Sequence, residues 1–388
     1  ITNLIKMDKV HIGLVATIII LLSGLVWMIG TTPVPSTKIE TITKTETMVQ
    51  TVFGTTTVTS TNSSIITVTT TATTTATITR TITVNSIIDE SGGPFAYVAH
   101  QQSDDIYIVD LGTGEVVSTF DVGDNPHEVV LHPTRPLLYV AVAGSRMVSV
   151  VDIETLDTIA IMPTGNYPHG LALTQNGKYL YVTVDNPQQV WVFNTENNER
   201  IAAINVGIAP HMIVIDSTDT FAYVTNIASN SVSVLDISSN TVVDTIIVDE
   251  GPEGLALSLD GKILYVANQG SGTISIIDTD TRQIIDTIDE MGGRPIRISI
   301  TPDQKLILIS HFNTNEVSIL NATTTEVIVT LQVGPRPIMI AFHTNENFAY
   351  ISNLATNYIS IIDLDKLEVV GIIEVGDGPD DIAISSLD

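Results

Sequence analysis

The chain has 388 residues, no cysteine and a formal net charge of −27, with only 16 lysines and arginines. The lack of cysteine excludes disulfides, thiolate metal sites and covalently attached c-type haem. The acidic balance argues against nucleic-acid binding, which needs a basic surface to displace counterions, so we expect no nucleic-acid partner.

The first predicted element is a membrane-spanning helix over residues 12–30. Its first 18 residues are uncharged and mostly apolar, and as a helix they would span about 27 Å, close to the hydrocarbon thickness of a bilayer. Lys6 and Lys9 precede the run, and the next basic residue is Lys38. The positive-inside rule therefore places residues 1–11 in the cytoplasm and the rest of the chain outside. A cleaved signal peptide is the alternative, but its apolar core is usually shorter and ends at a small-residue cleavage site.

Residues 31–86 are predicted to form a threonine-rich stalk, since 24 of residues 31–84 are Thr. Threonine is β-branched and favours extended backbone, and such a composition cannot bury enough apolar area to fold alone. Serine- and threonine-rich segments outside the cell are typical of O-glycosylated stalks. A disordered linker, or self-association of the alternating Thr, Ile and Val residues as strands, are the alternatives. Asn62 begins an N-glycosylation sequon here, and Asn321 begins another further along the chain.

Residues 87–388 repeat one pattern seven times, with three markers spaced by 42 or 43 residues. The first marker is Tyr97, Tyr139, Tyr181, Tyr223, Tyr265, Leu308 and Tyr350. The second is Pro126, Pro168, Pro210, Pro252, Pro295, Pro337 and Pro379, and the third is Asp110, Asp152, Asn194, Asp236, Asp278, Asn321 and Asp363. A fixed period of about 40–45 residues with short strands indicates a β-propeller with one blade per repeat. We therefore expect an all-β, seven-bladed propeller with four strands per blade.

The pattern also predicts the strands of a blade and the closure of the ring. The predicted strands of the repeat that begins at Pro210 are His211–Ile215, Phe221–Asn226, Val232–Asp236 and Val242–Val248. The first complete motif of the repeat, Phe95–His100, corresponds to the second strand of a blade. The chain ends with Asp381–Ser385, whose pattern is that of an innermost strand. We expect this last strand to complete the first blade, because closure removes the open edges of the ring.

Short sequence motifs within the repeat resemble those of a known family. Residues 223–226 read Tyr-Val-Thr-Asn, residues 232–236 read VSVLD, and residues 207–211 read Gly-x-x-Pro-His. Over residues 94–388 the chain resembles the YVTN β-propeller repeat family. The WD40 repeat has a similar length, but no Trp-Asp pair occurs in this chain. The resemblance implies an extracytoplasmic seven-bladed propeller, frequent on archaeal and bacterial surfaces, and the stalk and missing cysteines favour an archaeal-type cell-surface protein.

The residue after each marker proline is expected to ring one mouth of the central channel. In blade order these residues are His127, His169, His211, Glu253, Ile296, Ile338 and Asp380. Because the ring closes, Asp380 neighbours His127, and the five polar residues form one arc. Imidazoles with a carboxylate suit a transition metal, and carboxylate oxygens suit calcium, so the candidate metal ligands are His127, His169, His211, Glu253 and Asp380. The alternative is that Pro-His belongs to the repeat consensus and has a repeated structural role.

A second candidate site is an anion or sugar site on the same face. Arg294, Arg297 and Arg336 flank the marker prolines, and guanidinium groups bind carboxylate and phosphate well. His100 and His311 end second strands on this face and join them as candidate ligand-binding residues. The alternative is that the arginines are solvated or pair with the abundant acids.

The sequence contains no Gly-x-Ser-x-Gly elbow and no glycine-rich phosphate loop after a strand, so catalysis is not expected. We expect a membrane-anchored extracellular module for binding or adhesion, with a surface protein or glycan as its partner. One alternative is an extracytoplasmic metal-dependent enzyme or redox protein with its site at the channel mouth. Another is a structural subunit of a surface layer or filament.

Overall fold

The computed structural model describes residues 42–48, 66–72, 78–84, 94–289, 291–343 and 347–385. The chain divides into two units, Ile1–Gly92 and Gly93–Asp388. The predicted transmembrane helix at residues 12–30 lies outside the described residues. Within the described ranges, no helix is long and apolar enough to cross a membrane.

The first unit contains a three-stranded antiparallel sheet in the order β1-β3-β2. Its strands are β1 (Ile42–Met48), β2 (Ile66–Ala72) and β3 (Ile78–Val84). These three segments of the predicted stalk alternate threonine with other residues, a composition that suits paired strands. They are paired with one another, as the alternative of self-association as strands expects.

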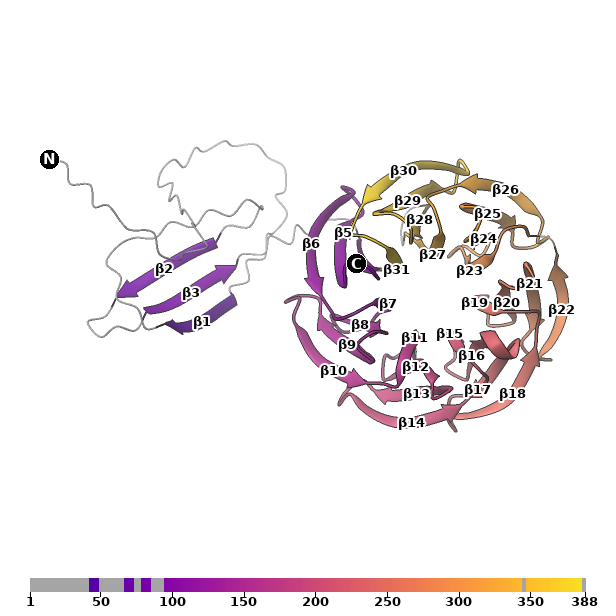
Figure 1. Ribbon diagram of the computed structural model, residues 1–388, viewed down its shortest axis with the longest axis horizontal. Coiled ribbons are helices and arrows are strands. Elements are labelled where there is room, and N and C mark those ends of the chain that lie inside the picture. Colours follow the sequence, from indigo (N-terminus) through magenta and orange to yellow (C-terminus); the bar gives the residue numbers. More distant parts are fainter. Residues whose placement is uncertain are drawn as a thin grey trace, which may run out of the picture. The chain divides into compact units, whose positions relative to one another are not determined.

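The second unit contains seven four-stranded antiparallel sheets around a central axis, as predicted (Figure 1). The innermost strands are β31 (Pro379–Ile384), β7 (Pro126–Leu131), β11 (Asn166–Leu173), β15 (Pro210–Ile215), β19 (Pro252–Leu257), β23 (Pro295–Ile300) and β27 (Pro337–Phe342). The second strands are β4 (Phe95–His100), β8 (Leu137–Val142), β12 (Tyr179–Asn186), β16 (Phe221–Asn226), β20 (Ile263–Asn268), β24 (Leu306–His311) and β28 (Phe348–Asn353).

The two outer layers complete the blades. The third strands are β5 (Asp105–Asp110), β9 (Met147–Asp152), β13 (Gln189–Asn194), β17 (Ser231–Asp236), β21 (Thr273–Asp278), β25 (Glu316–Asn321) and β29 (Tyr358–Asp363). The outermost strands are β6 (Glu115–Asp121), β10 (Thr158–Pro163), β14 (Glu199–Asn205), β18 (Thr241–Ile247), β22 (Gln283–Ile288), β26 (Val327–Gln332) and β30 (Glu368–Glu374). One short 3-10 helix, η1 (Ile227–Ser229), follows β16. In the blade that begins at Pro210, each predicted strand boundary agrees with the structure to within one residue.

The ring closes through the C-terminal strand, which confirms the prediction. Strand β31 pairs with β4, so that the sheet order of the first blade is β31-β4-β5-β6. Beyond the strand, Ser385 N donates to Phe95 O at 2.8 Å, and Phe95 N donates to Ser385 Oγ at 2.9 Å. Residues almost 300 positions apart in the chain therefore belong to one sheet.

The hydrophobic core lies between the blades. Among the described residues, the buried apolar side chains form seven clusters. Tyr139, for example, packs with Leu171 and Val182 of the next blade. The residues of the tyrosine marker are all buried, which explains why the marker repeats: each fills an interface between neighbouring blades.

The acidic marker has a local role at the turn after each third strand. Asp110 Oδ1, for example, accepts hydrogen bonds from Gly112 N at 2.8 Å and Thr113 N at 3.2 Å. Such bonds between a side chain and the backbone fix a tight turn. The acidic marker therefore repeats because it fixes the turn after each third strand, and it does not mark a binding site.

Candidate functional site

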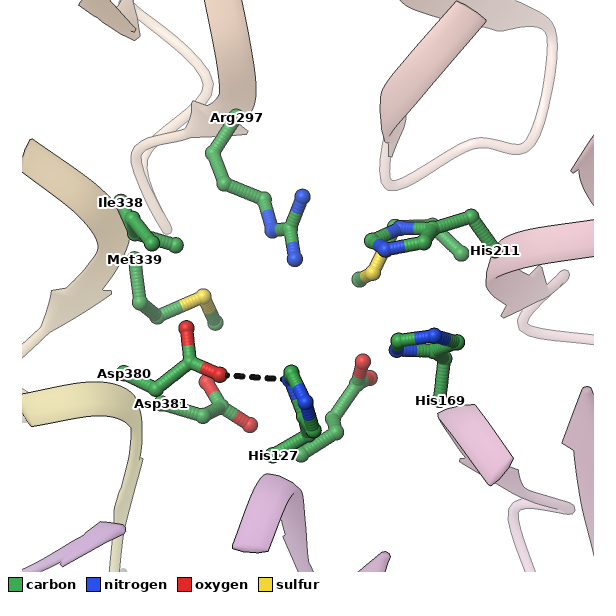
Figure 2. A pocket seen from close by; sticks show the side chains of 10 residues that line it. His127, His169, His211, Arg297, Ile338, Met339, Asp380 and Asp381 are labelled. Carbon is green, nitrogen blue, oxygen red and sulfur yellow. Dashed lines mark ion pairs between the residues drawn. The ribbon is translucent and has the colours of Figure 1, made fainter. Parts of the chain in front are cut away.

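Each innermost strand carries a β-bulge directly after its marker proline. In β7 the register with β8 shifts between Pro126 and Val129, and a comparable shift occurs in the other six blades. A bulge interrupts the alternation of side chains along a strand, so two consecutive residues of a blade turn toward the axis. Residues from both positions line one small axial cavity (Figure 2). They are His127, Glu128, His169, His211, Met212, Arg297, Ile338, Met339, Asp380 and Asp381.

A hydroxyl group in the second strand holds this bulge in several blades. Thr225 Oγ1 accepts a hydrogen bond from Met212 N at 3.0 Å and donates to Glu253 O of the next blade at 2.9 Å. Thr183 does the same in its own blade, where the carbonyl that accepts its proton belongs to His211. The threonine of the Tyr-Val-Thr-Asn motif therefore fixes the backbone of the axial residue in the following blade.

The three imidazoles of the predicted arc contact one another across neighbouring blades (Figure 2). The ring centroids of His127 and His169 lie 4.8 Å apart, and those of His169 and His211 lie 4.5 Å apart. Gly170 permits the second contact, because a Cβ there would collide with the backbone of β15. Burial, followed by the neighbouring imidazoles, lowers the pKa of His169 to about 3 and the pKa of His211 well below its usual value. Both rings are therefore neutral near pH 7.

Asp380 closes the arc at His127, as predicted. Asp380 Oδ2 lies 2.9 Å from His127 Nδ1, and it accepts a hydrogen bond from Gln101 Nε2 at 2.6 Å. Burial would raise the pKa of Asp380, but the hydrogen bond and the charge of His127 outweigh it, so that the pKa is lowered. Asp380 is thus a carboxylate that orients the ring of His127.

Arg297 belongs to this axial cavity, and it neutralises the remaining member of the arc. Arg297 Nη1 lies 3.1 Å from Glu253 Oε1. Gly254 allows this approach, because a Cβ there would lie 2.7 Å from the carbonyl oxygen of Ile296 in the next blade. Burial raises the pKa of Glu253 against the opposing charge of Arg297. Burial also disfavours the charged guanidinium, yet Glu253 and the other axial carboxylates raise the pKa of Arg297.

Two further axial acids, Glu128 and Asp381, were not predicted. Asp381 Oδ2 accepts a hydrogen bond from Val129 N at 2.7 Å, which joins β31 to β7. Burial, reinforced by Asp380, raises the pKa of Asp381 to about 6. Burial and the charge of Asp381 raise the pKa of Glu128 well above its usual value. Both residues stand two positions after a marker proline, where regular strand alternation would turn them away from the axis.

The arc is assembled, but its donors do not converge on one point. The histidines meet through their rings, and Glu253 is engaged by Arg297. In the part of the chain that the structure describes, no three His, Asp or Glu side chains are grouped so that they could hold a metal ion. The axial cavity measures about 10 Å³, which is room for about one water molecule. A metal on the five predicted ligands stays a prediction that requires side-chain rotation.

The two other predicted histidines, His100 and His311, lie inside their blades rather than in the axial cavity. His311 Nε2 lies 2.8 Å from Ser318 Oγ, and Asn353 makes the equivalent bond to the serine seven positions further on. His100 Nε2 accepts a hydrogen bond from Gly376 N at 3.1 Å, and burial lowers the pKa of His100 to about 4. His311 therefore links two strands of its blade, as the asparagine of the repeat does, and His100 holds the crossing from β30 to β31.

The remaining predicted ligand-binding arginines flank an aromatic ring that was not predicted. The guanidinium carbons of Arg294 and Arg336 each lie 5.4 Å from the ring centroid of Phe312. Arg294 directly precedes β23, Phe312 directly follows β24, and Arg336 directly precedes β27. These three positions lie at the same edge of two neighbouring blades, on the face that also carries the marker prolines.

Of the two sequons, Asn62 lies outside the described residues. Asn321 ends β25, and its Oδ1 accepts hydrogen bonds from Thr323 N at 2.8 Å and Thr324 N at 3.1 Å. It therefore makes the turn contacts of the acidic marker. Glycosylation of either residue stays a prediction.

Comparisons with known proteins agree with this architecture. A family model for YNCE-like β-propellers matches residues 162–295. Among the curated proteins, no sequence matches the chain. Several solved structures are similar at low sequence identity, and at that level the likeness shows the fold alone.

Hydrazine synthase from Kuenenia stuttgartiensis is similar with a TM-score of 0.63 and 20% identity, over 68% of this chain and 96% of that one. A functionally unknown protein from Desulfotomaculum acetoxidans has a TM-score of 0.67 and 16% identity, over 76% and 99% of the two chains. The dihydro-heme d1 dehydrogenase NirN has a TM-score of 0.58 and 14% identity, over 74% of each chain. The chain is thus a seven-bladed β-propeller with four strands per blade, and residues 162–295 of it match the YNCE-like β-propeller family.

Proposed function

We propose that the chain is a binding module displayed outside the cell on a membrane anchor. In this proposal residues 12–30 form the anchor, residues 31–86 the threonine-rich stalk, and residues 87–388 the head that binds a surface protein or glycan. The apolar run after Lys6 and Lys9 supports the anchor and its orientation. The self-repelling acidic charge of the chain suits a soluble head.

One observation carries the binding role: a regular scaffold presents chemically different side chains on one face. The seven blades share their turns and core, yet the residue after the marker proline changes from His to Glu, Ile and Asp around the ring. Binding residues are commonly placed in this way, on loops and strand ends held by a rigid framework. The axial cavity is too small for anything much larger than water, so a ligand of any size would contact the face around it.

The proposal is tested on the full chain in two steps. Protease treatment of intact cells expressing the full chain should remove the head and leave a membrane-bound fragment of the N-terminal region. The detergent-purified full chain should then bind isolated envelope material saturably. A head protected from protease in intact cells would contradict the topology, and a lack of saturable binding would contradict the function.

A second candidate is an extracytoplasmic metal-dependent enzyme or redox protein with its site on the axis. The observation in its favour is that His169 and His211 are held neutral, and that among the described groups His211 Nδ1 is buried without a hydrogen-bond partner. Neutral imidazole nitrogens are good ligands for transition metals. Two of the similar structures carry enzyme names, hydrazine synthase and a dihydro-heme d1 dehydrogenase.

Metal analysis of the purified full chain separates the two candidates. The metal-dependent enzyme requires about one equivalent of transition metal that is lost in the His169→Ala variant and retained in a His343→Ala variant on the opposite face. Metal-free protein that still binds envelope material would rule out the metal-dependent enzyme and support the binding module. The third alternative, a subunit of a surface layer or filament, stays a prediction.

A further inference from the structure

Arg294, Phe312 and Arg336 together form a group that we call the arginine platform, in which Arg336 is exposed and the other two side chains are partly buried. Each guanidinium carbon lies 5.4 Å from the centroid of the one phenylalanine ring. Cations are attracted to the face of an aromatic ring at this distance. The ring therefore holds two positive groups together. Strands β23 and β27, which these arginines directly precede, belong to neighbouring blades (Figure 1).

The platform is positive in a strongly acidic chain. The chain has 43 acidic and only 16 basic residues. Within the described ranges, neither guanidinium of the platform has a carboxylate at ion-pair distance, whereas Arg297 is paired with Glu253 at 3.1 Å. Between described residues the platform thus makes no ion pair, although the charge of Arg294 opposes the rise in the pKa of Glu253, whereas the charge of Arg297 is engaged in its pair with Glu253.

The guanidinium of Arg294 is also oriented. Its Nε donates a hydrogen bond to Gln269 Oε1, which leaves its terminal nitrogens as donors. A guanidinium that is held in place loses less freedom on binding, and its planar fork matches the oxygens of a carboxylate or phosphate.

The backbone of Arg336 follows the pattern of the repeat. Its φ is +54°, in the left-handed region that side chains other than glycine rarely adopt. The equivalent residues before Pro252 and Pro379 are Gly251 and Gly378, with φ of 68° and 70°. Asn125, Tyr167 and Ala209 occupy the equivalent position with φ of 57°, 54° and 56°, so the positive φ belongs to the repeat, and Arg336 differs from these residues in presenting a guanidinium there.

We propose that the arginine platform binds a dianionic oxyanion, either a dicarboxylate or a phosphate group. Two guanidinium groups on one ring match two negative charges, and each presents the donors that such oxygens accept. The inference rests on the proposed binding function, because it names the chemistry that the face recognises. It concerns Arg294 and Arg336 and excludes Arg297, which is committed to Glu253.

The test is calorimetric titration of the full chain at low ionic strength with succinate and, separately, with inorganic phosphate. We expect Arg336→Gly to weaken binding at least about tenfold, as loss of charge-assisted hydrogen bonds does. The melting temperature of this variant should be unchanged or higher, because glycine relieves the strain at a positive φ. Arg294→Gln should weaken binding comparably and provides a second variant with normal backbone geometry.

Arg146→Gly is the matched control. Arg146 is exposed, has a φ of +57° and lies in the loop between β8 and β9 on the same face, so its replacement makes the same change of charge and backbone away from Phe312. If both glycine variants weaken oxyanion binding equally, the effect comes from overall charge, and the proposal that the arginine platform binds the oxyanion is contradicted. Failure of wild type to bind either probe at about 10 mM, a concentration that detects dissociation constants in the millimolar range, would also overturn it.

The same variants separate this inference from the proposed function. Envelope binding that persists in Arg336→Gly would leave the binding module standing and reject the platform as its site. Oxyanion binding that depends on Arg336, in a chain that binds no envelope material, would support the platform and reject the proposed function.

Discussion

The most unusual residues chemically are the axial acids, where burial conflicts with charge. Glu128 and Asp381 share the axial cavity, and burial raises the pKa of both carboxyl groups, reinforced by the charge of Asp381 at Glu128 and by the charge of Asp380 at Asp381. A carboxyl group with a raised pKa in the folded state binds its proton more tightly there than in the unfolded chain. Its favourable contribution is complete below the unfolded pKa and is lost as the pH rises through the folded pKa.

Glu128→Gln should therefore stabilise the protein at high pH. Near pH 4 the variant and wild type should have the same free energy of unfolding. Above that pH the variant should have the higher free energy of unfolding, by about 1.4 kcal/mol for each pH unit between the unfolded and folded pKa of Glu128. Denaturant unfolding at pH 4, 6 and 8 measures the difference. Glu154→Gln, in an exposed turn, is the control for replacing a carboxylate by an amide away from the axis. A Glu128→Gln variant that is less stable than wild type at pH 8 would contradict the assignment.

Gly254 has a second residue-scale role, because it sets the distance between two blades at the axis. A Cβ at this position would lie 2.7 Å from Ile296 O and 2.9 Å from Arg297 Cα, and backbone atoms there cannot move aside easily. Gly254→Ala should cost about 1–3 kcal/mol through overpacking and loosen the pair of Arg297 with Glu253. Gly371→Ala is the control, since the nearest atom to its Cβ would be the end of Ile361 at 3.8 Å. Equal unfolding midpoints in denaturant for the two variants would show that the close approach is unimportant.

At the scale of elements, β31 is the strand on which the ring depends. It supplies the inner strand of the first blade and carries Asp380 and Asp381. Without it, β4 would become an open edge beside the axis, and the two neighbouring blades would lose a packing partner.

Deletion of residues 380–388 should therefore lower the melting temperature by about ten degrees or more, since each kcal/mol is worth about 2–4 °C in a domain of this size. A chain that ends at residue 385 keeps β31 and serves as the control. Differential scanning calorimetry of both chains measures the effect. A fall of only a degree or two after the longer deletion would be incompatible with closure through β31.

Much of this element structure could be predicted from the sequence, because the repeat averages local signals over seven copies. The strands of the blade from Pro210 and the pairing of the last strand with the first blade are confirmed. Glu128 and Asp381 were missed because a bulge after each proline overrides the alternation on which strand prediction relies. Phe312 was missed because it lies in a loop, where no periodicity marks a neighbour in space.

For the whole molecule, the central claim is that a ligand contacts the face around the marker prolines rather than the opposite face. Tyr167 is 56% exposed on the proline face, directly before Pro168. Leu259 is 67% exposed in the turn between β19 and β20, at the opposite ends of the strands. Each offers a position for a photo-crosslinking residue that changes little else.

The most direct measurement is photo-crosslinking of the full chain to envelope material from these two positions in parallel. The binding-module account predicts a saturable crosslinked product from position 167 that is competed by unlabelled wild type, and little product from position 259. Equal products from both positions, or a product from position 259 alone, would contradict it.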